Sequence, residues 1–174
     1  HLSGPDWGTC GSAALLLVQA SNSAPPGVHR SPYEPRALLS QWRAVIALTE
    51  PRQIIFLGDS FHDNEARERI DADDLATLRD ITGHVDTIWI TGNHDPQPPT
   101  DNGGRIVDEV ALGAITLRHE PQDLAVGEFE IAGHLHPGDG VSQRGRHMRR
   151  KCFIANAWRG GMPDFGSFTG GSGV

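Results

Sequence analysis

The stretch "QIIFLGD", residues 53–59, decides the fold class of this chain. It is a run of β-branched and apolar residues ending in Gly-Asp, which is the pattern of a strand buried on both faces. Apolar residues at helical spacing precede it over 33–51, and a short helix with acidic residues in its first turn is predicted over 71–83. Another buried strand opens "DTIWITGNHDP", residues 86–96. This alternation of strand and helix predicts an α/β protein.

The second half of the chain has a different pattern, in which strands predominate. Residues 105–120 predict two strands around Gly113. Three further strand segments separated by glycine-rich turns are predicted at 127–137, 150–158 and 163–171. Together with a first strand over 14–18, they indicate a layered α/β fold with a mixed sheet or two packed sheets. Because the sequence has no internal repeat and no clear linker, residues 1–174 are expected to form a single domain.

The composition excludes several classes of protein. No apolar run approaches the roughly 20 residues that a membrane span needs, so no membrane partner is expected. The two cysteines, Cys10 and Cys152, indicate neither a disulfide framework nor a cysteine metal site, which favours the reducing cytoplasm. A net charge of −7 argues against nucleic-acid binding through a generally basic surface.

One segment of this acidic chain is strongly basic. Its members are Arg144, Arg146, His147, Arg149, Arg150 and Lys151. Such a run most often forms the solvent-exposed tip of a hairpin. A loop that contacts the phosphates of a nucleic acid is the alternative, and the position of the run just after a pair of histidines keeps it open.

Side chains able to bind a metal ion follow several of the predicted strands. They are Asp59, Asn93, His94, Asp95, His119, His134 and His136. In open α/β sheets the loops at the carboxyl ends of strands converge on one crevice. If the strand continues through "GHLH" (133–136), alternation also aims both of its histidines at one point. Carboxylate, amide and imidazole ligands suit Mn²⁺, Fe or Zn²⁺, so the sequence predicts a divalent metal site.

These residues carry a resemblance to a known family. The motifs "GDSFHD" (58–63), "GNHD" (92–95) and "GHLH" (133–136), with a lone histidine after a strand, resemble the calcineurin-like metallophosphoesterases. Together with "PYEPRALL", "LRHEP" and "PDFGSFTGG", they look most like the ligase-associated DNA-damage-response endonuclease branch, over roughly Tyr33 to Gly171. The resemblance implies an αββα sandwich with mixed sheets and a phosphodiesterase that acts in DNA repair.

The resemblance also implies a pair of metal ions, with Mn²⁺ expected and Fe or Zn²⁺ as alternatives. Asp59 would bridge the two ions. Asn93, His119 and His134 would complete one site, and His136 would serve the other.

Further roles follow from the same resemblance. His94 would be the general acid, with Asp95 orienting it. The phosphodiester substrate would be nucleic acid. A DNA ligase and a helicase are the implied protein partners, and the oligomeric state stays open.

Apart from the resemblance, His62 and Asp63 lie close to Asp59 in the sequence and are candidates for contacting the metal ligands, with a substrate wall or an ordinary turn as the alternatives. If the basic run contacts phosphates, Arg144, Arg146, Arg149 and Arg150 would do so.

The chain departs from the family pattern in residues 1–32. The family has a D-x-H motif after its first strand, and here Ala20 and Asn22 stand in those positions. Alanine cannot bind a metal, and Asn22 would be a weak, uncharged replacement ligand. Asp6 and His29 are the other residues that could replace the missing D-x-H ligands. One or two metal ions per chain are therefore expected, with the site of Asp59 and His136 in doubt.

Three functions remain open from the sequence. The first is a metal-dependent phosphodiesterase or endonuclease acting on DNA. The second is a catalytically impaired metal-binding subunit that docks to a ligase or helicase, which the missing D-x-H motif favours. The third is a small-molecule phosphoesterase, because one scaffold can serve many substrates.

Overall fold

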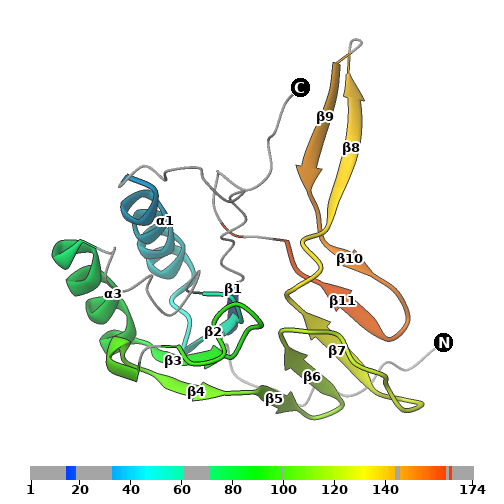
Figure 1. Ribbon diagram of the computed structural model, residues 1–174, viewed down its shortest axis with the longest axis horizontal. Helices are drawn as coiled ribbons and strands as arrows, with labels where there is room; N and C mark the ends of the chain where they lie inside the picture. The colour runs from blue at the N-terminus through cyan, green and yellow to red at the C-terminus, as the bar shows by residue number, and fades with distance from the viewer. Residues whose placement is uncertain are drawn as a thin grey trace.

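The structure is a computed structural model, shown in Figure 1, that describes residues 15–18, 33–60, 71–98, 100–143, 146–163 and 165. Its first sheet has four strands, all parallel, in the order β1-β2-β3-β4. These strands are β1 (Leu15–Val18), β2 (Gln53–Leu57), β3 (Asp86–Ile90) and β4 (Arg105–Val107). The sequence pattern predicted the first three, and each begins within one residue of its predicted start.

Two helices cover one face of this sheet (Figure 1): α1 (Tyr33–Thr49) and α3 (Ala72–His84). The start of α3 is capped by Asp71, whose side chain accepts a hydrogen bond from the backbone N–H of Asp73 at 2.9 Å. The helices and the sheet enclose a core of Leu39, Trp42, Ile54, Phe56, Leu78, Ile81 and Trp89. This packing fixes β2 and β3 on the face of the first sheet that the helices cover.

The second sheet has five strands in the order β10-β11-β7-β6-β5. They are β5 (Glu109–Leu112), β6 (Ile115–Arg118), β7 (Phe129–Ala132), β10 (Ile154–Ala155) and β11 (Arg159–Gly161). The central pairs are parallel and the two outer pairs antiparallel, so the sheet is mixed. A second core of Ile55, Leu57, Ile88, Ile90 and Leu117 lies between the two sheets.

The layered α/β prediction with two packed sheets is thus confirmed. Because successive residues of β2 and β3 alternate between the helices and the second sheet, both strands are buried on two faces. Within the described ranges the α-helices lie on the first sheet, and none of them covers the outer face of the second. No helix among these residues has the length and apolar character that a membrane crossing requires.

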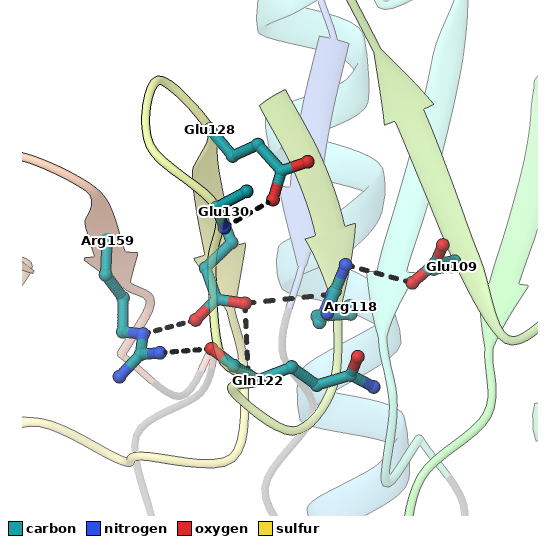
Figure 2. Close-up of polar contacts among 7 residues, drawn as sticks. Glu109, Arg118, Gln122, Glu128, Glu130 and Arg159 are labelled. Atoms are coloured by element: carbon teal, nitrogen blue, oxygen red, sulfur yellow. Dashed lines mark hydrogen bonds and ion pairs between the residues drawn. The ribbon is translucent and has the colours of Figure 1, made fainter. Parts of the chain in front are cut away.

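The outer face of the second sheet carries an ion network (Figure 2), centred on the fully buried Glu130. The Arg159 Nε donates to Glu130 Oε1, and the backbone N–H of Gln122 donates to Glu130 Oε2 at 3.2 Å. Arg118 Nε lies 3.7 Å from Glu130 Oε2, and another nitrogen of this guanidinium lies 3.1 Å from Glu109 Oε2. The network therefore joins four strands: β5, β6, β7 and β11.

A two-stranded antiparallel hairpin, β8 (Gly138–Gln143) and β9 (Arg146–Lys151), projects away from both sheets (Figure 1). The sequence placed the basic run in a hairpin tip or loop, and the structure places most of it on β9. A single strand was predicted over 150–158. That prediction was wrong, because β9 ends at Lys151 and the chain forms only the short β10 before it turns back.

Candidate metal centre

Three side chains that can bind a metal ion converge at the carboxyl ends of β2, β6 and β7. Asp59, His119 and His134 each offer a ligand atom, and these atoms all lie within 4.8 Å of one another. Asn93, which follows β3, joins them, because its Oδ1 lies 2.9 Å from Nε2 of His119. The structure thus brings these four side chains together, and their role as metal ligands stays a prediction.

Two glycines allow the close approach of these groups. Gly58 adopts φ +79°, and a Cβ at this position would lie within 2.6 Å of three atoms of the His119 side chain. A Cβ at Gly92 would lie within 2.5 Å of the backbone nitrogen of Asp59 and of Oδ1 of Asp95. Asp59 itself has φ +49°, a left-handed conformation that aspartate tolerates better than most residues. The "GD" and "GN" steps of the sequence are therefore structural requirements of the site.

The ring of His119 is fixed by its other nitrogen. Nδ1 lies 2.8 Å from the carbonyl oxygen of Leu57, so it donates there and leaves Nε2 to face the cluster. Nε2 is 3.1 Å from Asp59 Oδ2 and 3.2 Å from Nδ1 of His134.

The donor set fits a divalent cation. The separations from His119 Nε2 to its three neighbours are 2.9, 3.1 and 3.2 Å. Adjacent ligand atoms of a six-coordinate ion with bonds of about 2.1 Å lie about 3.0 Å apart. Asp59 and His119 are both buried, at 5% and 3% exposure, and two such groups rarely sit together without a shared cation or proton.

The surroundings of Asp59 and His119 favour a negative charge on the first and a positive charge on the second. Burial alone would raise the pKa of Asp59, but hydrogen bonds from His119 and from the backbone of His94 hold this pKa below its ordinary value. Burial would likewise lower the pKa of His119, while the hydrogen bond to Asp59 raises it above the ordinary value. A proton on His119 thus balances the carboxylate in the position where a metal cation would do so.

The "GNHD" loop contributes more than its predicted ligand. The backbone N–H of His94 donates to Asp59 Oδ1 at 3.0 Å, and the His94 side chain is exposed. Asp95 is buried, and its Oδ1 accepts a hydrogen bond from the backbone N–H of Asp59 at 2.9 Å. The sequence suggested Asp95 only as a group that orients His94. Its hold on Asp59 was missed, since nothing in the local pattern pairs residues 36 apart.

The histidine pair of "GHLH" does not lie on a strand. β7 ends at Ala132, so both histidines belong to the following loop, and His136 adopts φ +40°. The prediction that strand alternation aims both histidines at one point was wrong, because the strand ends at Ala132, before either histidine. The two rings are still neighbours, with centroids 6.5 Å apart. His136 is therefore placed beside the cluster but outside it.

Several predicted site residues lie outside the described part of the chain. They are Asn22, His62, Asp63 and Arg144. Arg146, Arg149 and Arg150 are placed by the backbone of β9, where they pair with Gln143, Gly140 and Asp139 of β8. Their role as phosphate contacts stays a prediction.

One of the comparisons with known proteins identifies a relative. No protein-family model matches the chain, and no curated protein does. A solved structure, the crystal structure of Pseudomonas putida nuclease MPE, matches with a TM-score of 0.68 and 30% sequence identity. The match covers 92% of this chain and 78% of that one. The chain belongs to the same family as Pseudomonas putida nuclease MPE.

Proposed function

We propose that the protein is a metal-dependent phosphodiesterase, an endonuclease that hydrolyses phosphodiester bonds of DNA. The observation that carries this proposal is the set of donor atoms around Nε2 of His119, at 2.9 to 3.2 Å. The relationship to a nuclease supports the reaction class. The motifs shared with the ligase-associated endonucleases support DNA as the substrate and DNA repair as the process.

Asp59, Asn93, His119 and His134 would hold the first metal ion, with Mn²⁺ proposed over Fe or Zn²⁺. Such an ion would bind the substrate phosphate and lower the pKa of a bound water. Asp59 and His136 would hold a second ion, and this site is the weaker one, because Ala20 and Asn22 replace a carboxylate and an imidazole.

His94 is the proposed general acid. Its backbone N–H is fixed to Asp59 Oδ1 at 3.0 Å, while its side chain is exposed to solvent. The anchored backbone places His94 beside Asp59, and its exposed imidazole is not one of the clustered ligand groups, so we propose that it protonates the leaving oxygen. We propose that Asp95 holds the backbone of Asp59 in place through its hydrogen bond, and that it also orients His94.

The β8–β9 hairpin would contact the nucleic-acid backbone. In its register Arg149 pairs with Gly140 and Lys151 with Gly138, whereas Arg150 pairs with Asp139. Glycine brings no charge to its partner in this register, whereas Asp139 brings a negative one, so we propose Arg149 as a stronger phosphate contact than Arg150.

The second candidate function is a metal-binding subunit with impaired catalysis, docking to a ligase or helicase. The replacement of the D-x-H motif by Ala20 and Asn22 favours it. A small-molecule phosphoesterase is a third possibility on the same scaffold. We place the protein in the cytoplasm because of its few cysteines, of which Cys152 is a free thiol.

The deciding experiment combines metal counting with cleavage of an oligonucleotide. The protein is loaded with Mn²⁺, freed of excess ion and analysed by mass spectrometry for metal per chain. Two ions with cleavage support the proposal, and one ion without cleavage supports the docking subunit. No bound ion overturns the metal centre.

Matched histidine variants make the result specific. His119→Ala and His134→Ala are expected to lose the metal and the cleavage together. His84→Ala is the control, because His84 ends α3, is exposed and lies apart from the cluster, with its Nδ1 2.6 Å from the Asp80 carbonyl oxygen. Equal losses in all three variants would contradict the assignment of ligands.

A further inference from the structure

The ion network on the outer face of the second sheet reaches the chain segment that carries His119 (Figure 2). We call residues 118–122 the His119 segment. Leu117, the residue before it, packs into the core between the two sheets. Because successive side chains of a strand point to opposite faces, Arg118 points to the network on the outer face and His119 to the metal cluster on the inner side. The His119 segment therefore lies between the network and the cluster.

Glu130 holds the His119 segment at both ends. Its Oε2 lies 3.7 Å from Nε of Arg118, at the start of the segment, and accepts a hydrogen bond from the backbone N–H of Gln122, at its end, at 3.2 Å. Arg159 completes this hold, because its Nε donates to Glu130 Oε1 and its Nη2 donates to the carbonyl oxygen of Gln122 at 2.7 Å. One carboxylate and one guanidinium on neighbouring strands thus fix the segment in place.

The burial of Glu130 makes these contacts costly to break. Its side chain is 0% exposed, although no helix within the described ranges covers this face of the sheet. A buried carboxylate is stable only while charged or hydrogen-bonding partners surround it. The positions of Arg118 and Gln122 are therefore tied to that of β7, the strand of Glu130.

The same strand leads to the other histidine of the metal cluster. His134 lies just beyond the end of β7, and its backbone N–H donates to the carbonyl oxygen of His119 at 3.1 Å. The ring atoms that face each other, Nδ1 of His134 and Nε2 of His119, are 3.2 Å apart. A shift of the His119 segment relative to β7 would change this separation.

We propose that Glu130 is a positioning residue of the metal centre, which fixes His119 at the distance from His134 that a shared ion requires. This inference rests on the proposed function, because it takes the two histidines as metal ligands. Glu130 lies on the opposite face of the sheet from the cluster, so it acts through the His119 segment and not by contact with the ion or the substrate. Ligands that are held in place lose less conformational freedom when an ion binds, so the metal affinity depends on the network.

The alternative is that Glu130 only ties β6, β7 and β11 together. Its replacement would then lower the free energy of unfolding, but the folded protein would bind metal as before. Stability and metal affinity must therefore be measured separately.

Two variants weaken the network at different points. Glu130→Gln keeps the size of the side chain and removes its charge. Arg159→Lys keeps a positive charge, but a single ammonium group cannot reproduce the fork that reaches both Glu130 and Gln122. Because the Arg159 side chain is 33% exposed, this variant is expected to fold even if Glu130→Gln does not. In a titration of the folded protein, each variant is expected to bind Mn²⁺ about tenfold more weakly than wild type.

Leu39→Ala is the matched control for stability. Leu39 is buried in the core on the helix-covered face of the first sheet, apart from the network. Its truncation leaves a cavity and is expected to lower the urea midpoint of unfolding at least as much as the network variants do. Because the two sites share no partners, its Mn²⁺ affinity is expected to stay within about twofold of wild type.

A second readout follows the ligand itself in the metal-free protein. Nδ1 of His119 donates to the carbonyl oxygen of Leu57 at 2.8 Å, so its proton is expected to exchange slowly with water and to give an NMR signal. Both network variants are expected to lose this signal through faster exchange, whereas Leu39→Ala keeps it. A loss of stability alone would not distinguish the variants in this way.

Two results would overturn the inference. One is an unchanged Mn²⁺ affinity with an unchanged His119 signal in the network variants, and the other is an equal loss of both in Leu39→Ala. Failure of the proposed function looks different. Wild-type protein would then bind Mn²⁺ without cleaving an oligonucleotide, and the Mn²⁺ affinities of the variants would still decide the inference. Wild-type protein that binds no Mn²⁺ would overturn the metal centre and the inference together.

Discussion

Replacement of Gly58 by alanine isolates the close packing on which the metal centre depends. Gly58 and Gly113 both have positive φ, +79° and +64°, so alanine at either position introduces backbone strain of about 1–2 kcal/mol. The two sites differ in their surroundings. A Cβ at Gly113 would meet nothing within 4 Å, whereas a Cβ at Gly58 would lie within 2.6 Å of three atoms of His119.

The additional cost at Gly58 follows from what His119 must give up. To make room, its ring has to move away from β2, and its 2.8 Å hydrogen bond to the carbonyl oxygen of Leu57 is lost. A buried polar group without a partner costs about 1–3 kcal/mol. We therefore expect Gly58→Ala to lower the free energy of unfolding by about 2–5 kcal/mol and Gly113→Ala by about 1–2 kcal/mol.

The assay measures unfolding and metal binding together. Urea denaturation without metal gives the two free energies of unfolding, and titration with Mn²⁺ gives the affinities. Because the hydrogen bond that His119 donates to the Leu57 carbonyl orients this ligand, Gly58→Ala is expected to bind Mn²⁺ about 10- to 100-fold more weakly, and Gly113→Ala to bind normally. Equal destabilisation by both variants, with equal Mn²⁺ affinity, would refute the reasoning.

The remaining predictions concern single groups. His94→Ala is expected to abolish hydrolysis while metal content stays the same, and unchanged turnover would contradict its role as general acid. Arg149→Ala is expected to reduce the salt dependence of oligonucleotide binding more than Arg150→Ala, because Arg149 pairs with Gly140 in the register and Arg150 with Asp139; equal slopes would contradict this difference. Because the pKa of His119 lies above its ordinary value, Mn²⁺ must displace a proton from it. Mn²⁺ affinity is therefore expected to fall as the pH is lowered through the neutral range, with proton release detected by calorimetry in two buffers. A pH-independent affinity would argue against His119 as a ligand.

The sequence predicted those parts of the structure that depend on local patterns. Apolar residues at helical spacing located α1, acidic residues in a first turn located α3, and uninterrupted apolar runs located β2 and β3, because each of these patterns lies within a single element. Asp59 and Asn93 could be identified as site residues because both follow buried parallel strands, whose carboxyl ends share an edge. Neither inference requires knowing which distant residues Asp59 and Asn93 contact.

The parts that were missed depend on pairs of residues far apart in the chain. The bond between Asp95 and the backbone of Asp59 spans 36 positions, and no local signal announces it. The loop position of His134 and His136 follows from where β7 ends, which "EIAGHLHP" does not show. Glu130 occupies an ordinary strand position, and its burial depends on Arg159, 29 residues later.

The ion network on the second sheet has a consequence for the order of folding. Glu130 lies on β7, and one of its two arginine partners arrives only with β11, near the end of the described chain. Until β11 docks, the carboxylate lacks this partner, so a sheet of β5, β6 and β7 alone would be poorly stable. Docking of β11 is therefore needed to pair Glu130 with both arginines, and a chain shortened before Arg159 is expected to form a less stable second sheet.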